Sequence, residues 1–154
     1  MTTPASGRLI EDDRDIAALL SGVRRIAVLG IKTEAQANQP AFYVPEYLVE
    51  AGLDVVPVPV YYPEVTQILG RPVFRTLVDV PGPIDLVDVF RRSEDMMPHA
   101  DEVLALPPER RPRVFWMQTG IRNDAAAAKL TAAGIQVVMD RCLGVYAARY
   151  RPET

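Results

Sequence analysis

The chain has 154 residues, of which 49% are hydrophobic and 24% charged, the composition of an ordinary globular domain. Its net charge of −3 excludes a broad electrostatic attraction to nucleic acids or anionic membranes. A single cysteine excludes an internal disulfide, and His, Cys and Asp are not spaced as metal ligands. No segment resembles a signal peptide or a membrane span, so we expect a cytoplasmic protein with neither nucleic acid nor membrane as a partner.

The first elements are a helix and a buried strand. Apolar residues at helical spacing predict a helix over about residues 10–23, with caps supplied by the acidic run Asp12 to Asp15. Residues 25–30 follow as a β-branched, apolar run that ends in Gly30. We expect this run to be a strand that is buried on both faces.

The next helix contains a proline. Val44, Tyr47, Leu48 and Ala51 share one face, and a start near Ala41 or Phe42 would place Pro45 in the first turn, where no hydrogen bond is lost. A second strand is predicted over residues 54–58. Because proline cannot donate to a sheet, the prolines at 57 and 59 favour an edge position for this strand.

Strands and helices continue to alternate to the C-terminus. The remaining predicted elements are strands over 84–90, 113–118 and 135–139, helices near 97–104 and 124–134, and a short C-terminal element. This order predicts an α/β fold: a Rossmann-like, doubly wound, mostly parallel five-stranded sheet with helices on both faces. We expect a single domain over 1–154, with the N-terminal helix followed by a core over about 25–150. All strand-to-helix loops then meet at the carboxyl edge of the sheet, where such folds bind ligands.

The loop after the first strand is suited to phosphate. Gly30 permits a tight turn, while Ile31, Lys32 and Thr33 bring backbone N–H groups, a charge and a hydroxyl to the start of the next segment. A full G-x-G-x-x-G is absent. Binding of NAD would also need an acidic residue at the end of the second strand. That place holds Pro57-Val58-Pro59, which argues against NAD and indicates an apolar wall for an adenine ring.

Two further loops contain polar side chains at the same edge. Phe90, Arg91, Arg92 and Ser93 combine two guanidinium groups with a helix cap, a pattern that fits either phosphate binding or a surface ion-pair cluster. The 118–120 loop places an amide (Gln118), a hydroxyl and Gly120 at the end of the fourth strand.

Residues typical of catalysis are few. Cys142 lies beside Arg141 and is either a reactive thiol or a buried, inert one. His99, the single histidine, is predicted on a helix at the surface or pocket rim. The nucleophile elbow of hydrolases and the phosphate loop of kinases are both absent, which indicates a site that holds a ligand rather than one that reacts with it.

Four segments carry a resemblance to a known family: residues 26–30 (IAVLG), 85–95 (DLVDVFRRSED), 116–123 (WMQTGIRN) and 133–143 (AGIQVVMDRCL). Together they resemble the small, stand-alone CoA-binding proteins, which look like an isolated CoA-binding domain of the succinyl-CoA synthetase alpha subunit. The resemblance extends over roughly 15–150. The loop at 32–40 departs from the short Ser-Pro-Asn-Pro type of the family, and the chain has no room for the second domain that a ligase needs.

The resemblance implies coenzyme A as the ligand. It places the diphosphate at the Gly30 loop, adenine against residues 57–60 and the pantetheine arm past the 90–93 and 118–120 loops. The candidate binding residues are therefore Gly30, Ile31, Lys32, Thr33, Pro57, Val58, Pro59, Phe90, Arg91, Arg92, Ser93, Gln118 and Gly120. No catalytic residue is assigned.

The predicted function is binding of CoA or an acyl-CoA without catalysis. The alternatives are a small enzyme that acts on CoA thioesters or CoA disulfides through Cys142, and an NAD-type oxidoreductase. A homodimer is possible through Tyr61, Tyr62, Tyr146 and Tyr150.

Overall fold

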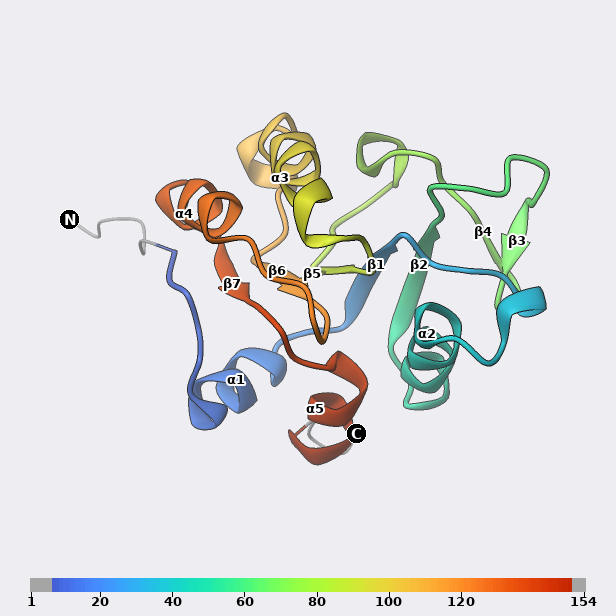
Figure 1. Cartoon of the computed structure of the whole chain (residues 1–154), viewed down its shortest axis with the longest axis horizontal. Coiled ribbons are helices and arrows are strands. Elements are labelled where there is room, and N and C mark those ends of the chain that lie inside the picture. Colours follow the sequence, from blue (N-terminus) through green and yellow to red (C-terminus); the bar gives the residue numbers. More distant parts are fainter. Residues whose placement is uncertain (1–6, 151–154) are drawn as a thin grey trace.

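The computed structural model describes residues 7–150. Its centre is a five-stranded, all-parallel sheet in the order β2-β1-β5-β6-β7 (Figure 1). The strands are β1 (Arg25–Leu29), β2 (Asp54–Val58), β5 (Leu86–Val89), β6 (Val114–Met117) and β7 (Gln136–Val138). The predicted α/β fold, its five parallel strands and the edge position of β2 are confirmed.

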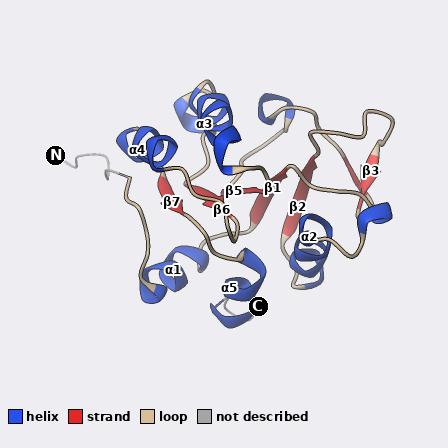
Figure 2. Cartoon of the chain, viewed as in Figure 1, coloured by secondary structure: helices blue, strands red, loops and turns tan. Residues whose placement is uncertain are grey.

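Helices cover both faces of the sheet, as predicted (Figure 2). The helices α1 (Asp13–Leu20), α2 (Pro40–Glu50) and α5 (Leu143–Tyr150) pack on one face, and α3 (Met96–Leu104) and α4 (Asp124–Ala132) pack on the other. Since successive strand residues point to opposite faces, each strand supplies both apolar clusters, and this is why the strands are apolar throughout.

The N-terminal helix is shorter than the predicted 10–23. It begins at Asp13 because the Asp12 side chain caps it, accepting from the N–H groups of Arg14 and Asp15. Such a cap stabilises a helix by about 1 kcal/mol. The residues before the cap are extended instead: Leu9 pairs with Val137 of β7 in an isolated parallel bridge. They thereby cover part of the β7 edge.

The segment between β2 and β5 contains elements that the sequence pattern did not predict. The strands β3 (Gln67–Ile68) and β4 (Arg71–Pro72) form a small antiparallel hairpin beyond the β2 edge, and the 3-10 turn η2 (Leu77–Asp79) follows. Two-residue strands are too short to show an alternating pattern. The Phe74 N–H donates to the Pro57 carbonyl at 3.0 Å, so this segment occupies part of the free edge of β2.

The other 3-10 turns are η1 (Glu34–Gln36), η3 (Ser93–Asp95) and η4 (Pro108–Arg110). Over the described range 7–150, every helix is too short or too polar to span a lipid bilayer.

Candidate functional site

The strand order reverses between β1 and β5, and the loops after these two strands touch. Gly30 has a φ of +86°, and a Cβ on it would lie 2.4 Å from the Phe90 carbonyl oxygen. The Gly30 N–H donates to Val58 and the Phe90 N–H to Leu29, each at 2.9 Å. Glycine is therefore required here by the close approach of two loops at the switch point, the place where open α/β sheets bind ligands.

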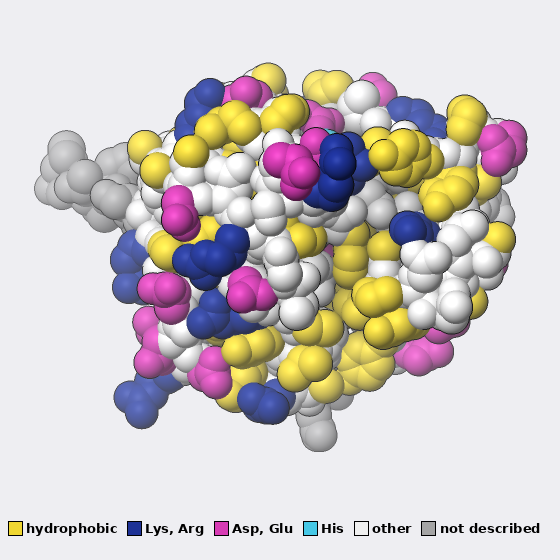
Figure 3. All heavy atoms as spheres, in the orientation of Figure 1, with side chains coloured by type: hydrophobic (Ala, Val, Ile, Leu, Met, Phe, Trp, Pro, Cys, Tyr) yellow, Lys and Arg dark blue, Asp and Glu magenta, His cyan; other side chains and the backbone are white. Residues whose placement is uncertain are grey.

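The main pocket opens beside this switch point. It has a volume of about 760 Å³ and lies on the face of the sheet that α2 and α5 cover. Its wall combines cations with apolar and amide groups: Lys32, Gln39, Pro40, Ala41, Tyr43, Val44, Tyr61, Phe90, Arg91, Arg92, Gln118, Thr119, Ile121 and Cys142. Figure 3 shows hydrophobic side chains over α2 and α5, with adjacent basic and acidic side chains above them, near the start of α3.

Lys32 is held at the pocket by one contact to α2 and one to its N-cap residue, Gln39. The helix begins at Pro40, so Pro45 lies beyond the first turn, and the expectation that it would lose no hydrogen bond is wrong. Proline has no N–H to donate to the Ala41 carbonyl. That oxygen instead accepts from the Lys32 N–H at 3.0 Å, and the Lys32 Nζ donates to Gln39 Oε1 at 2.5 Å. The proline thus leaves the Ala41 carbonyl of α2 available to bind the loop through Lys32.

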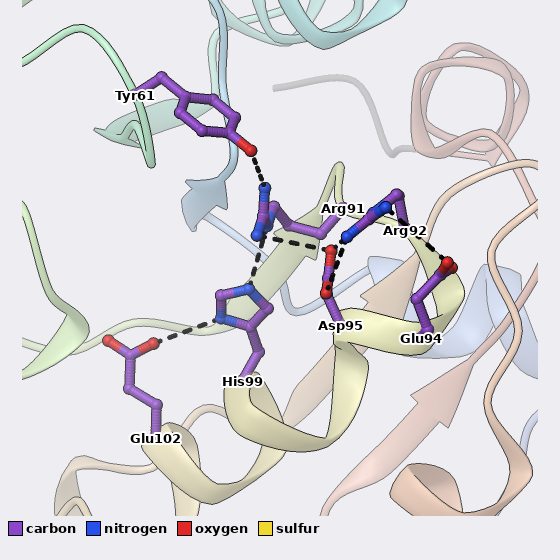
Figure 4. A network of polar contacts seen from close by, with 7 residues as sticks. All are labelled: Tyr61, Arg91, Arg92, Glu94, Asp95, His99 and Glu102. Carbon is purple, nitrogen blue, oxygen red and sulfur yellow. Dashed lines mark hydrogen bonds and ion pairs between the residues drawn. The ribbon is translucent and has the colours of Figure 1, made fainter.

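Arg91 is the centre of a polar network (Figure 4). Its guanidinium donates to the Tyr61 hydroxyl at 3.2 Å and lies over the Tyr61 ring, 5.5 Å from the centroid. Arg91 Nε donates to His99 Nε2 at 3.3 Å, and Asp95 lies 3.5 Å away. His99 Nδ1 lies 3.6 Å from Glu102 Oε1. Arg91 is thus fixed from three sides.

The carboxylates around this network keep their charge. Burial raises the pKa of Glu102, but hydrogen bonds from His99 and the Leu77 N–H outweigh it, and the net pKa is lowered. The hydrogen bond from Arg92 likewise lowers the pKa of Asp95. Arg92 itself is exposed and reaches the pocket only at its rim.

Ser93 and Gly120 shape the loops rather than the pocket wall. The Ser93 hydroxyl and carbonyl accept from Arg122 N and Asn123 Nδ2, each at 3.0 Å. The Gly120 N–H donates to Asp140 Oδ1 at 2.6 Å. Asp140 has a φ of +58°, a conformation that is uncommon outside glycine. The 118–123 loop is thereby fixed to the ends of β5 and β7.

A second pocket lies on the opposite face of the sheet, against α3. It has a volume of about 600 Å³ and is lined by Leu29, Pro59, Val60, Arg75, Thr76, Val78, His99, Glu102, Ala105 and Leu106. His99, in its wall, bonds to Arg91, in the wall of the main pocket. One hydrogen bond therefore links the walls of the two pockets.

The floor beneath the main pocket contains a fully buried acid. Asp88, on the central strand β5, accepts at Oδ1 from Gln118 Nε2 at 2.5 Å, and its Oδ2 has no hydrogen-bond partner within residues 7–150. Burial raises the pKa of Asp88 to about 7, although the bond from Gln118 lowers it. An uncharged carboxyl is therefore well populated at neutral pH.

The predicted site residues separate into three groups. Lys32, Phe90, Arg91, Arg92 and Gln118 line the main pocket, and Pro59 lines the second. Gly30, Pro57, Ser93 and Gly120 belong to the surrounding backbone and loops. The side chains of Ile31 and Val58 are buried in the core, and Thr33 caps the η1 turn with its hydroxyl. Cys142, singled out for its chemistry, does line the main pocket.

Sequence reasoning missed two parts of this arrangement. The first part is the start of α2, which lies in the pocket wall with Tyr43 and Val44, whereas its apolar spacing predicts only a buried face. The second part is Asp88, which belongs to the 85–95 segment but has no predicted role. The available signal is that Asp88 lies in the middle of the predicted strand 84–90, between Val87 and Val89, whereas Asp85 lies near its start.

The strand order and the two pockets place the chain in the class of Rossmann-like α/β proteins. The CoA binding domain family matches residues 24–148. The chain belongs to this family and carries its CoA-binding domain, as the resemblance predicted.

Relatives and solved structures agree with this assignment. The chain is 34% identical over 131 residues to the uncharacterized protein YneT of Bacillus subtilis (strain 168), an alignment that covers 85% of this chain and 90% of YneT. The structure of cell-free ID.343 from Thermus thermophilus has 38% identity and a TM-score of 0.78, covering 91% of this chain and 99% of that one. A hypothetical protein from Pyrococcus horikoshii OT3 has 29% identity and a TM-score of 0.77, covering 97% of each chain.

Proposed function

We propose that the protein binds coenzyme A or an acyl-CoA across the carboxyl edge of the sheet, without catalysing a reaction of its own. The observation that supports this most is the pair of pockets whose walls are linked by the bond from Arg91 to His99. The main pocket adds three cations and two amides to an apolar wall, while the second pocket is mainly apolar. An elongated ligand with an aromatic base, a diphosphate and a flexible arm needs such a divided site.

The diphosphate is proposed to lie near Lys32 and Arg91. Within the Gly30–Thr33 loop, the N–H groups of Gly30, Lys32 and Thr33 already have acceptors inside the protein. The Ile31 N–H has no acceptor among residues 7–150, so contact from this loop is proposed to go through this N–H and the Lys32 ammonium group. Arg91 supplies a planar guanidinium group suited to phosphate oxygens.

The adenine is proposed to lie against Pro59 and Val60 in the second pocket. The pantetheine arm then follows the main pocket past Phe90 and Gln118. Isothermal titration with CoA tests the whole proposal, with saturable binding at one site per chain as the expected result. Absence of heat at millimolar CoA would contradict it. Mass spectrometry of small molecules released from the purified protein would identify the acyl group.

A second candidate function rests on Cys142, because its side chain lines the main pocket. Its thiolate would attack a CoA disulfide, forming a mixed disulfide with one CoA and releasing the other as a thiolate. Alkylation of the native protein, compared with Cys142→Ser, tests this function. A thiol that is inert to alkylation would exclude it.

The oligomeric state is a separate prediction. Of the four tyrosines considered for a homodimer, Tyr61 is 62% exposed, while Tyr146 and Tyr150 direct their hydroxyls to Asp13. Light scattering after gel filtration measures the mass in solution. A monomer at all concentrations would remove the homodimer from consideration.

A further inference from the structure

We propose that Asp88 is a positioning residue whose bond to Gln118 sets which end of the Gln118 amide faces the main pocket. The inference rests on the proposed function, because it concerns how the CoA arm is recognised. Asp88 does not itself line the pocket and acts through Gln118.

The geometry gives Gln118 two different ends. Its Nε2 donates to Asp88, while its Oε1 makes no hydrogen bond to any other described residue. Gln118 is only 4% exposed and lines the pocket. In this orientation the carbonyl is the end left to accept from a ligand N–H or S–H donor, and Asp88 holds it there.

The charge on Asp88 decides how firmly this orientation is held. An ionised carboxylate only accepts hydrogen bonds, so it requires the NH2 end of Gln118. A protonated carboxyl also donates, and it can pair with Gln118 Oε1 after the amide turns over. Protonation of Asp88 therefore permits the opposite orientation of the Gln118 amide. In that orientation the NH2 end faces the pocket and donates to an acceptor such as a thioester carbonyl.

Other charges around Asp88 do not override this control. Its neighbours across the sheet are Val28 of β1 and Trp116 of β6, and the helices α1, α2 and α5 add apolar side chains to the cluster on this face. Tyr146, which packs on Trp116, donates its hydroxyl to Asp13. The titratable groups of the pocket wall are Lys32, Tyr43, Tyr61, Arg91, Arg92 and Cys142, and none of them is bonded to Asp88.

A titration without ligand tests the positioning directly. Carbon-13 NMR of the Asp88 carboxyl is expected to show a midpoint near 7, and the side-chain amide signals of Gln118 are expected to shift with the same midpoint. In Asp88→Asn the Gln118 signals should be independent of pH. An Asp88 that titrates in the ordinary acidic range, or Gln118 signals that do not follow it, would overturn the proposal.

Binding tests the consequence for ligands. In the wild type, CoA is expected to bind roughly two- to fivefold more tightly at pH 8 than at pH 6, because the affinity follows the fraction of protein in the competent orientation. The 3′-phosphate of CoA titrates in the same range, but it affects binding to the wild type and to Asp88→Asn equally. The ratio of the two CoA affinities therefore isolates the effect of Asp88. If the ratio of the two CoA affinities is the same at pH 6 and pH 8, the proposal is overturned. If neither protein binds CoA, the proposed function fails, and the titration still decides the role of Asp88.

Discussion

The two faces of the central strand β5 differ in polarity. One face is wholly apolar and has a structural role, whereas the other contains one buried acid and faces the candidate site. Val87 and Val89 point toward α3 and α4 into a wholly apolar cluster. On the other face Leu86 is followed by Asp88, a buried acid beneath the main pocket. A buried carboxyl costs stability unless it is paired, so its presence on only one face indicates that this face serves the site.

The largest expected effect comes from placing an acid on the apolar face. Val87→Asp has no amide partner there, so at pH 8 it should lower the free energy of unfolding by about 4 kcal/mol or more. Urea unfolding measures this. Val87→Ala is the matched control for lost volume. If the two variants were equally stable, an acid would carry no extra cost on this face, and the proposed difference between the two faces of β5 would be contradicted.

Replacing the natural acid, Asp88, should change the free energy of unfolding at pH 8 in the direction opposite to Val87→Asp. Because folding raises the pKa of Asp88 from 3.8 to about 7, the folded state binds more protons than the unfolded state between these values. The raised pKa of Asp88 therefore favours the folded state most below pH 3.8. This stabilising contribution is lost as the pH rises to about 7. From pH 5 to pH 8 the wild type should lose about 3 kcal/mol more than Asp88→Asn. Parallel stability curves for the two proteins would refute this.

Arg91→Ala tests the functional face at its rim. We expect CoA affinity to fall by about 10- to 100-fold, the loss typical of a hydrogen bond to a charged group. Isothermal titration is the measurement. Arg122→Ala is the control, since Arg122 is exposed and pairs with Asp124 away from the pocket wall. Equal losses in the two variants would indicate a general charge effect.

Lys32→Ala should have a smaller effect, about three- to tenfold, because a single ammonium group near water is worth about 1 kcal/mol. The salt dependence of CoA binding should become shallower in this variant. Titrations at two salt concentrations check both points. An affinity equal to that of the wild type would remove Lys32 from the phosphate site.

The sequence predicted most of the fold because its signals are local and repeated. Five apolar runs, the cap at Asp12 and the edge position favoured by the prolines at 57 and 59 each match the structure. The hairpin at 67–72 escaped because it is held by tertiary contacts. For the site, the chemistry of Lys32, Arg91 and Gln118 was visible in the loops. The role of Pro45 and the burial of Asp88 depend on partners distant in sequence, Lys32 and Gln118, which no local pattern reveals.

The location of CoA on the molecule is tested most directly by amide NMR during a CoA titration. We expect saturable shifts in the residues around the main pocket, above all Lys32, Arg91 and Gln118, while the outer turns of α4 remain unchanged. Shifts confined to α4 and its surroundings, or no shifts at millimolar CoA, would contradict the account.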